Sequence, residues 1–380
     1  MPPLPFPSLL IQNFRALRKL EIPHLGRVNL ITGKNNVGKS SLLEAIQAYA
    51  SAFSPEVVRW VLNGRDEYWA RPSARDAGGR DDDLLPYNLR YLFYARPAID
   101  QEIPPIYVGP DGSDRPTIGL QISYFKVVLE EEEEEFGDTT TTRLYVPVKV
   151  SDLPQNLDAS LYVTTLLGGG MSTRTPLERF FKSPSRQFPI GHTIKSQFVP
   201  AQGFGPQDVG LMWDAITLTS LESEVLTSLR LLSPDIERIT FVGDALERRG
   251  RHALVKFSGG DEPVPLKSLG EGVNRLFGLT LALVNAKDGL LLVDEIESGL
   301  HYGVQSQLWR YIFRLAALLN VQVFAITHSY DCVRAFQEAA TEHPDDGLLI
   351  RLERKGENLG ATLFEESELE IAADHDIEVR

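Results

Sequence analysis

The chain has 380 residues, of which 43% are hydrophobic, enough to bury a large core and to form two or three domains of roughly 150 residues. Its formal net charge of −14 does not by itself attract nucleic acid or an anionic membrane, so any contact with DNA must come from a local patch or a partner. A single cysteine, Cys332, excludes intramolecular disulfides and a multi-cysteine zinc site, and it fits a protein of the reducing cytoplasm.

The first residues, MPPLPFPS, contain too many prolines and no basic segment for a signal peptide, so we expect a short disordered lead. Two short strands follow at Leu9–Phe14 and Leu20–Ile22, separated by a turn. The longest apolar run, Leu276–Ala286, is too short to span a membrane and contains Asn285. We therefore expect a cytoplasmic protein without a membrane partner.

The stretch VNLITGKNNVGKSS at residues 28–41 predicts a phosphate-binding loop. A buried strand ends at Ile31, and the apolar spacing from Lys39 to Ala50 is that of a helix, so the pattern G-x-x-x-x-G-K-S lies between a strand and a helix. Its glycines let the backbone approach phosphate oxygens, its lysine reaches the β- and γ-phosphates, and its serine hydroxyl is a candidate Mg²⁺ ligand. A glycine-rich turn before an ordinary helix is the alternative. The candidate nucleotide-binding residues are Gly33, Asn35, Asn36, Val37, Gly38, Lys39, Ser40 and Ser41, and Ser40 is the candidate metal ligand.

The middle of the chain changes from helical to strand-like patterning. A helix is predicted at Pro55–Leu62, and the charged stretch Arg71–Asp83 is expected to be mobile. Apolar residues alternate from Ile118 to Tyr124 and again around Pro147, which predicts antiparallel strands, the second at a sheet edge because proline cannot donate a ladder hydrogen bond. The acidic run Glu130–Glu135 between them predicts a solvated hairpin tip, with docking of a basic partner as the alternative.

Residues 168–192 are rich in Gly, Ser, Pro and Arg, which predicts a flexible connection. A short strand, Gln197–Pro200, then returns to the core, and the apolar spacing from Pro206 to Leu232 is helical. Ile236–Val242 and Ala253–Phe257 are predicted to pair as strands around a polar turn.

A second anion-binding segment is predicted at Ser268, Gly270 and Glu271, which precede a helix running to about Val284. A hydroxyl, a glycine and a helix N-terminus can together bind an anion. Ordinary helix capping is the alternative.

Two adjacent carboxylates, Asp294 and Glu295, follow the buried strand Leu290–Val293. Carboxylates in such a place are costly to bury unless a cation or a proton-transfer role compensates. Asp294 would hold Mg²⁺, directly or through water, and Glu295 would orient and deprotonate an attacking water. Capping of the next helix is the alternative.

His328 follows the apolar strand Val321–Ile326. A histidine at a strand end next to a γ-phosphate can donate a hydrogen bond to it and sense its loss, whereas an isolated histidine would be assigned to packing or to the surface. Its position, one helix and one strand after the carboxylate pair, favours the functional interpretation.

The motifs GKNNVGKS, KSLGEG, LLLVDEIESGLH and ITHS resemble the ATPase heads of the ABC class, and more closely the RecF/SMC/OLD branch than the transporters. The opening IQNFRALRKLEI resembles the N-terminal strands of RecF and OLD proteins, and the form DEIESGLH, with Glu297 and His301, resembles OLD-type ATPases. The resemblance covers about residues 9–60 and 196–350. It implies one α/β head of the P-loop NTPase, ABC-ATPase type, with a mixed-sheet core at 8–60 and 196–370, an antiparallel β lobe inserted at 61–195, and a helical subdomain.

The resemblance also implies that ATP and Mg²⁺ are held between two copies of the chain, in a homodimer or a higher homo-oligomer. The phosphate loop and Asp294 of one copy would bind the nucleotide and the metal, while Ser268, Gly270 and Glu271 of the other would contact the γ-phosphate. It implies an ATP-hydrolysing switch that works by nucleotide-dependent dimerisation in DNA repair or anti-phage defence. A slow ATPase sensor that controls a separate effector, such as a nuclease or toxin, is one alternative, and a transporter-type ATPase is another.

Members of this family also carry a glutamine that contacts the metal and the water. Gln202 is the candidate, with Gln197 or Gln121 as alternatives. The sequence departs from the family pattern at Leu269, where glycine is common, and at His301, where transporters have an aspartate. It lacks a long heptad insertion, and only about fifty residues follow the ITHS motif, too few for the Toprim domain of OLD nucleases, so no nuclease activity is expected.

Overall fold

The computed structural model describes residues 4–67, 88–98, 101–111, 117–133, 139–156, 158–168, 172–181, 193–243, 251–260, 262–343, 345–356 and 358–364. The chain forms two compact units, the first containing Met1–Pro7, Ile22–Leu43 and Ile194–Arg380, and the second Ser8–Glu21 and Glu44–Thr193. The predicted mobile stretch Arg71–Asp83 lies outside the described residues, as does much of the predicted connection at 168–192.

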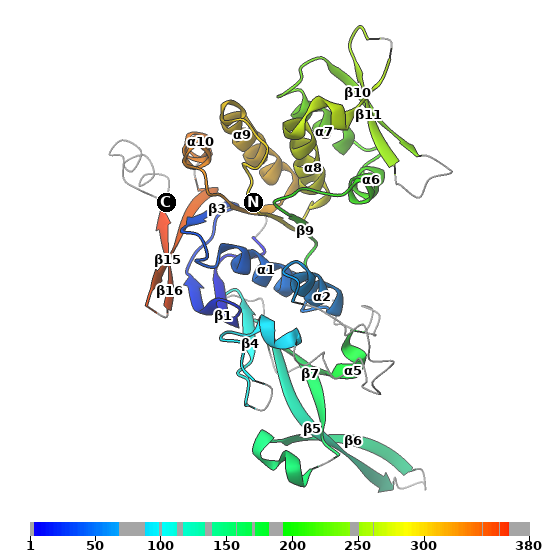
Figure 1. The fold of residues 1–380 in the computed structure, drawn as a ribbon, viewed down its shortest axis with the longest axis vertical. Helices are drawn as coiled ribbons and strands as arrows, with labels where there is room; N and C mark the ends of the chain where they lie inside the picture. The colour runs from blue at the N-terminus through cyan, green and yellow to red at the C-terminus, as the bar shows by residue number, and fades with distance from the viewer. Residues whose placement is uncertain are drawn as a thin grey trace. The chain divides into compact units, whose positions relative to one another are not determined.

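The first unit is built on a six-stranded mixed sheet in the order β16-β15-β3-β14-β13-β9 (Figure 1). The strands from β15 to β9 are parallel, and β16 is antiparallel at the edge. Every residue of β3, β13 and β14 is buried, as expected for parallel strands covered on both faces. The strand bounds are β3 Val28–Gly33, β9 Ser196–Val199, β13 Leu290–Val293, β14 Gln322–Ile326, β15 Gly347–Lys355 and β16 Asn358–Phe364.

The helices of this unit follow the predicted apolar spacing, except that the segment predicted as helical from Pro206 to Leu232 forms two helices. The predicted strand pair forms a separate three-stranded sheet, β10-β11-β12, and most of its turn lies outside the described residues. Helix α1 begins in the first unit and ends in the second. The bounds are α1 Lys39–Ala50, α6 Pro206–Asp214, α7 Leu221–Leu229, α8 Glu271–Asn285, α9 Tyr302–Leu319, α10 Tyr330–Ala340, β10 Ile236–Gly243, β11 Arg251–Phe257, β12 Val264–Pro265 and the 3-10 turn η6 Leu266–Leu269.

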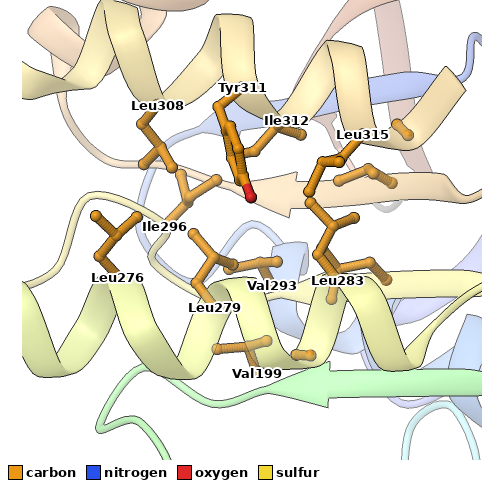
Figure 2. Close-up of a cluster of buried hydrophobic side chains, with 14 of the residues drawn as sticks. Val199, Leu276, Leu279, Leu283, Val293, Ile296, Leu308, Tyr311, Ile312 and Leu315 are labelled. Atoms are coloured by element: carbon orange, nitrogen blue, oxygen red, sulfur yellow. The ribbon is translucent and has the colours of Figure 1, made fainter. Parts of the chain in front are cut away.

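The core of the first unit packs α8 and α9 against the sheet (Figure 2). Leucines of the two helices point toward one another and toward Val293 of β13 and Val199 of β9, all at most 4% exposed. Each such leucine contributes about 1.5–3 kcal/mol by burial. The packing fixes the N-terminal end of α8 with respect to the end of β13. The leucines are Leu276, Leu279 and Leu283 of α8 and Leu308 and Leu315 of α9.

The segment around Phe6 is ordered, so the prediction of a disordered lead is wrong there. The backbone N–H of Phe6 donates to the side-chain oxygen of Gln322 at 2.9 Å, and the Gln322 amide donates to the carbonyls of Phe6 at 2.7 Å and Gly26 at 2.9 Å. The Phe6 ring is fully buried and meets Phe324 edge to face. The three hydrogen bonds of this buried amide stabilise the segment and outweigh the tendency of a proline-rich sequence to be disordered.

The second unit contains a seven-stranded sheet in the order β2-β1-β4-β5-β7-β8, with β6 paired to β5. Strands β1 and β2 therefore belong to this sheet, although the expected core boundaries placed them in the nucleotide-binding core; the hydrogen-bonding edge of β1 is taken by β4. Those boundaries as functional domains stay a prediction. The bounds are β1 Leu9–Phe14, β2 Leu17–Ile22, α2 Pro55–Asn63, η2 Arg90–Leu92, β4 Ile106–Gly109, β5 Ile118–Glu133, β6 Thr139–Val148, η3 Val150–Gln155, β7 Ser160–Leu167, β8 Ser172–Pro176 and α5 Leu177–Phe180.

The acidic run is part of a strand rather than of a hairpin loop. Glu130–Glu133 continue β5 and pair in register with Thr139–Thr142 of β6, so the predicted hairpin tip is wrong for these four residues. Threonine has a high strand propensity, which favours this pairing. The last two residues of the run lie outside the described residues. Pro147 lies on β6, which pairs with β5 alone among the described strands, so its edge position is confirmed.

Candidate functional site

The phosphate-loop sequence forms a strand, loop and helix as predicted. Gly33 and Gly38 have φ values of 139° and 118°, a region that favours glycine, and Asn36 is left-handed at 60°. A Cβ at Gly33 would stand 2.5 Å from the carbonyl oxygen of Leu352, so no side chain fits where the loop begins. The first backbone N–H groups of α1 have no partner within the helix and form an anion-binding end.

Lys39 is buried at the base of the loop, only 4% exposed. Its Nζ donates to the carbonyls of Gly33 at 2.5 Å and Lys34 at 3.0 Å. Burial lowers the pKa of Lys39, and the nearby carboxylates, Asp294 first among them, oppose this shift. The loop therefore holds a desolvated amine whose charge a phosphate would stabilise.

Ser40 and Asp294, which are distant in sequence, lie together. The Ser40 hydroxyl is 3.5 Å from Oδ2 of Asp294, because β3 and β13 are parallel strands separated by β14 and end at the same edge of the sheet. A hydroxyl and a carboxylate oxygen are the hard donors that Mg²⁺ prefers. In the part of the chain that the structure describes, no group of three or more His, Cys, Asp or Glu side chains could hold a metal. The hydroxyl of Ser40 and the carboxylate of Asp294 are suited to supply two ligands to Mg²⁺.

Glu295 directly follows Asp294 in a left-handed backbone conformation, with φ at 47°. This conformation costs a non-glycine residue on the order of 1–3 kcal/mol and is found most often at functional sites. Its side chain is half-buried. The backbone turns sharply here, so the two adjacent carboxylates are not arranged as in a regular strand.

Arg275 of α8 donates hydrogen bonds to the backbone carbonyls of the two residues that carry these carboxylates. It was not among the site residues predicted from the sequence. Its Nη1 donates to the carbonyl of Pro200 at 2.6 Å, and its Nη2 donates to the carbonyls of Asp294 at 2.9 Å and Glu295 at 3.0 Å. The residue is 7% exposed, and burial lowers its pKa against the opposing charge of four acidic side chains. The available signal was a single arginine next to the apolar face of a helix.

His328 lies at the end of β14, the strand between the phosphate loop and the carboxylates. Its backbone N–H donates to Oε1 of Glu297 at 2.8 Å, and the N–H of Thr327 donates to the carbonyl of Ile31 at 3.1 Å. Ser329 then caps α10 through the N–H of Cys332 at 3.3 Å. Glu297, known from the sequence only as part of the resemblance, thus positions the backbone of the histidine.

The predicted second anion-binding segment lies on the surface of the same unit. The side chains of Ser268 and Glu271 are exposed, and the Ser268 hydroxyl donates to the carbonyl of Pro265 at 2.7 Å. Gly270, at φ 98°, has no atom within 4 Å of an added Cβ, and its carbonyl accepts from Asn274 at 2.6 Å. The segment forms the predicted helix N-terminus and faces solvent.

The three candidate glutamines lie at different places in the fold. Gln202 is exposed in the turn after β9, two residues beyond the Pro200 carbonyl that Arg275 binds. Gln197 lies within β9 opposite Leu291, and Gln121 lies on β5 of the second unit. The assignment of Gln202 stays a prediction.

The two departures from the family pattern have local structural roles. Leu269 lies in η6 and packs against the hydrophobic core. His301 caps α9, because its Nδ1 accepts the N–H of Gly303 at 3.1 Å. His301 therefore stabilises the start of α9, whereas Leu269 attaches η6 to the core.

A phosphate loop, a strand-end carboxylate pair and a strand-end histidine lie at the same end of the parallel strands of this mixed sheet, which is the arrangement of an α/β P-loop ATPase. The predicted fold class is confirmed, and the chain is an ATPase. Residues 226–331 match the family described as "AAA domain, putative AbiEii toxin, Type IV TA system", and residues 7–59 match "AAA ATPase domain".

Among known proteins, the chain is 23% identical to the ATP/GTP phosphatase of Helicobacter pylori, over 93% of this chain and 96% of that protein. It is 32% identical over 91 residues to the uncharacterized protein MJECL11 of Methanocaldococcus jannaschii, covering 24% of this chain and 80% of that protein. The chain belongs to one family with this archaeal protein. Among solved structures it is similar to an SmcHead bound to the C-winged helix domain of ScpA, with a TM-score of 0.49 and 12% identity over 96% of this chain and 99% of that one. No described helix is long and apolar enough to cross a membrane.

Proposed function

We propose that this chain is a cytoplasmic ATP-driven switch in which two copies close on bound ATP and separate after its hydrolysis. The observation that carries the proposal is the 3.5 Å approach of the Ser40 hydroxyl to Asp294, which joins the phosphate loop to the carboxylate pair in one site. We place the chain in the OLD-like branch, on the motif forms DEIESGLH and IQNFRALRKLEI.

Phosphate binding uses groups that the fold has already oriented. Lys39 and the backbone N–H groups of residues 33–41 would neutralise the β- and γ-phosphates. Ser40 and Asp294 would hold Mg²⁺, which when bound offsets charge on the phosphate oxygens. Catalysis of phosphoryl transfer then depends on positioning and electrostatics rather than on covalent chemistry.

Glu295 is the proposed general base. Its carboxylate would accept a proton from the water that attacks the γ-phosphate, and His328 would donate a hydrogen bond to that phosphate. Arg275 keeps the Glu295 backbone in place through its carbonyl. The exposed Ser268, Gly270 and Glu271 of a second copy would complete the site.

The experiment is the Glu295→Gln variant, which removes the base and keeps the shape of the side chain. We expect turnover to fall by about 10²–10⁴-fold. We also expect a stable ATP-dependent dimer by size-exclusion chromatography with light scattering. Glu342→Gln, at an exposed ion pair with Arg310, is the matched control and should leave both unchanged. Unaltered turnover together with an unaltered oligomeric state in Glu295→Gln would remove the proposed role.

A second candidate is a slow ATPase sensor that controls a separate effector. The match of residues 226–331 to a family whose description names a toxin–antitoxin system supports this candidate, for which we propose a role in anti-phage defence. Purification from the native host separates the two candidates. A stoichiometric nuclease or toxin would favour the sensor, whereas DNA-stimulated turnover of the isolated protein would favour a role in DNA repair.

A further inference from the structure

A mostly apolar cavity of about 670 Å³ lies beside the N-terminal half of α8. It is lined by the end of β9 and the turn after it, by α6, by β11 and by α8, all of which belong to the first unit. Val199 and Leu279, which are each 1% exposed, connect it to the hydrophobic core (Figure 2). The volume lies within the range of roughly 300–1,000 Å³ that is usual for small-molecule sites.

Three phenylalanine rings line this cavity. The rings of Phe241 on β10 and Phe277 on α8 have centroids 6.2 Å apart and planes 24° apart. Phe204, in the turn after β9, packs against Gly278 of α8, where an added Cβ would stand 3.2 Å from its Cδ2. Phe277 is buried, whereas Phe204 and Phe241 are half-buried and keep part of their surface open. A flat aromatic ligand can pack against such rings in offset or edge-to-face contact.

The charged side chains that line the cavity are mostly basic, although the chain has a net charge of −14. Arg251, Lys267 and Arg275 line it, against one acidic residue, Glu271. Arg251 is paired with Asp214, whereas the exposed Lys267 can turn its amino group toward a ligand. The first turn of α8 also lines the cavity, and a helix N-terminus favours negative charge. The lining therefore suits a ligand that carries an anionic group beside its apolar ring.

The cavity shares one side chain with the candidate nucleotide site. Arg275 lines the cavity, and its Nη2 donates to the carbonyls of Asp294 at 2.9 Å and Glu295 at 3.0 Å. Its Nε has no hydrogen-bond partner among the described residues, so the guanidinium is not fixed by all of its donors. A molecule in the cavity would therefore contact the side chain that positions the proposed base.

We propose that this cavity binds a small planar aromatic anion, and that its occupancy changes ATP turnover through Arg275. The ring lies among the three phenylalanines, and the anionic group lies near Lys267. Binding itself goes beyond the proposed function, whereas the effect on turnover rests on it.

The first experiment titrates the protein with two fluorescent probes. These are 8-anilinonaphthalene-1-sulfonate and the neutral N-phenyl-1-naphthylamine, which has the same rings without the sulfonate. We expect Lys267→Glu to weaken binding of the sulfonate by about tenfold, because it replaces an attraction by a repulsion, and to leave the neutral probe within about twofold of wild type. Lys256→Glu, at an exposed lysine of β11 outside the lining, is the matched control and should leave both within about twofold. An equal response of the two probes to Lys267→Glu, or no response of the sulfonate, would overturn the proposal.

Two further variants locate the bound probes, which are excited at their own absorption. Leu254→Trp introduces a larger side chain into the cavity from β11, and we expect it to weaken both probes by about tenfold or more. Lys39→Ala alters the phosphate loop and should bind both probes as wild type does. Circular dichroism verifies that each variant is folded. Full binding to folded Leu254→Trp, or lost binding to folded Lys39→Ala, would place the probes elsewhere and overturn the proposal.

The effect on turnover is measured by steady-state ATP hydrolysis with saturating sulfonate probe. We expect kcat of the wild type to change by about fivefold or more, with KM for ATP within about twofold, and Leu254→Trp not to respond. An unchanged kcat would overturn the coupling through Arg275. If the wild type neither hydrolyses ATP nor binds the ATP analogue AMP-PNP, the proposed function itself fails, whereas the titrations still decide whether the cavity binds aromatic anions.

Discussion

Arg275 shows how one buried side chain can organise a site that it does not enter. Its guanidinium binds three backbone carbonyls, two of which belong to Asp294 and Glu295, and it reaches them from the helix that begins at the second anion-binding segment. A charge at that depth is costly, and the hydrogen bonds from Nη1 and Nη2 to these carbonyls offset part of that cost, so the residue and the strand ends support each other. A change at Arg275 should therefore alter catalysis through the position of Glu295.

Arg275→Met keeps the length of the side chain and removes the donors. We expect kcat to fall at least tenfold with little change in KM for ATP, since the phosphate loop is untouched. We expect a loss of about 1–3 kcal/mol in the free energy of unfolding, because buried carbonyls lose their partner. Steady-state kinetics and urea unfolding measure the two effects, and Arg275→Lys should recover part of kcat. A rise in KM alone would show that Arg275 serves binding instead.

At the scale of the elements, the start of the phosphate loop is in close contact with β15. A comparison of two glycines with positive φ distinguishes the effect of close packing from that of backbone strain. Gly33 has the Leu352 oxygen 2.5 Å from the place of a Cβ, whereas Gly270 has nothing within 4 Å. Both have values of φ that alanine adopts poorly.

We expect Gly33→Ala to lower the free energy of unfolding by about 1–3 kcal/mol more than Gly270→Ala does, because only the first must push β15 away from β3. Urea unfolding measured on both variants gives the difference. Equal losses in the two variants would show that strain alone decides and that the loop is not packed against β15.

At the scale of the whole molecule, the two units share one helix. The boundary between them falls inside α1, whose first residue is Lys39 of the phosphate loop, and the chain passes between the units at four places. Because α1 contains residues of both units, complete unfolding of either unit requires part of α1 to unfold.

We therefore expect a single calorimetric unfolding transition that AMP-PNP with Mg²⁺ shifts upward as a whole. At a ligand concentration of 100 times Kd, mass action adds about 2.7 kcal/mol of stability. Differential scanning calorimetry with and without the nucleotide checks this, with Lys39→Ala as the control that should not shift. Two transitions, of which the nucleotide moves only one, would contradict the coupling.

The sequence predicted the elements well because their periodicity is local. The strand before the phosphate loop, the helix from Lys39 and the strand before Asp294 all have the predicted positions. It could not predict that β1 would pair with β4, because these strands are distant in the chain. It also missed Arg275 and the order around Phe6, because both depend on partners distant in the chain.

Gln322 is the first residue of β14, and its amide bonds to the proline-rich opening of the chain at Phe6. His328 stands just past the far end of that same strand. Deletion of the opening residues would remove two of the hydrogen bonds of that amide. It would also remove the buried Phe6 ring from the core. The opening segment, which the sequence suggests is dispensable, therefore forms part of the core of the first unit.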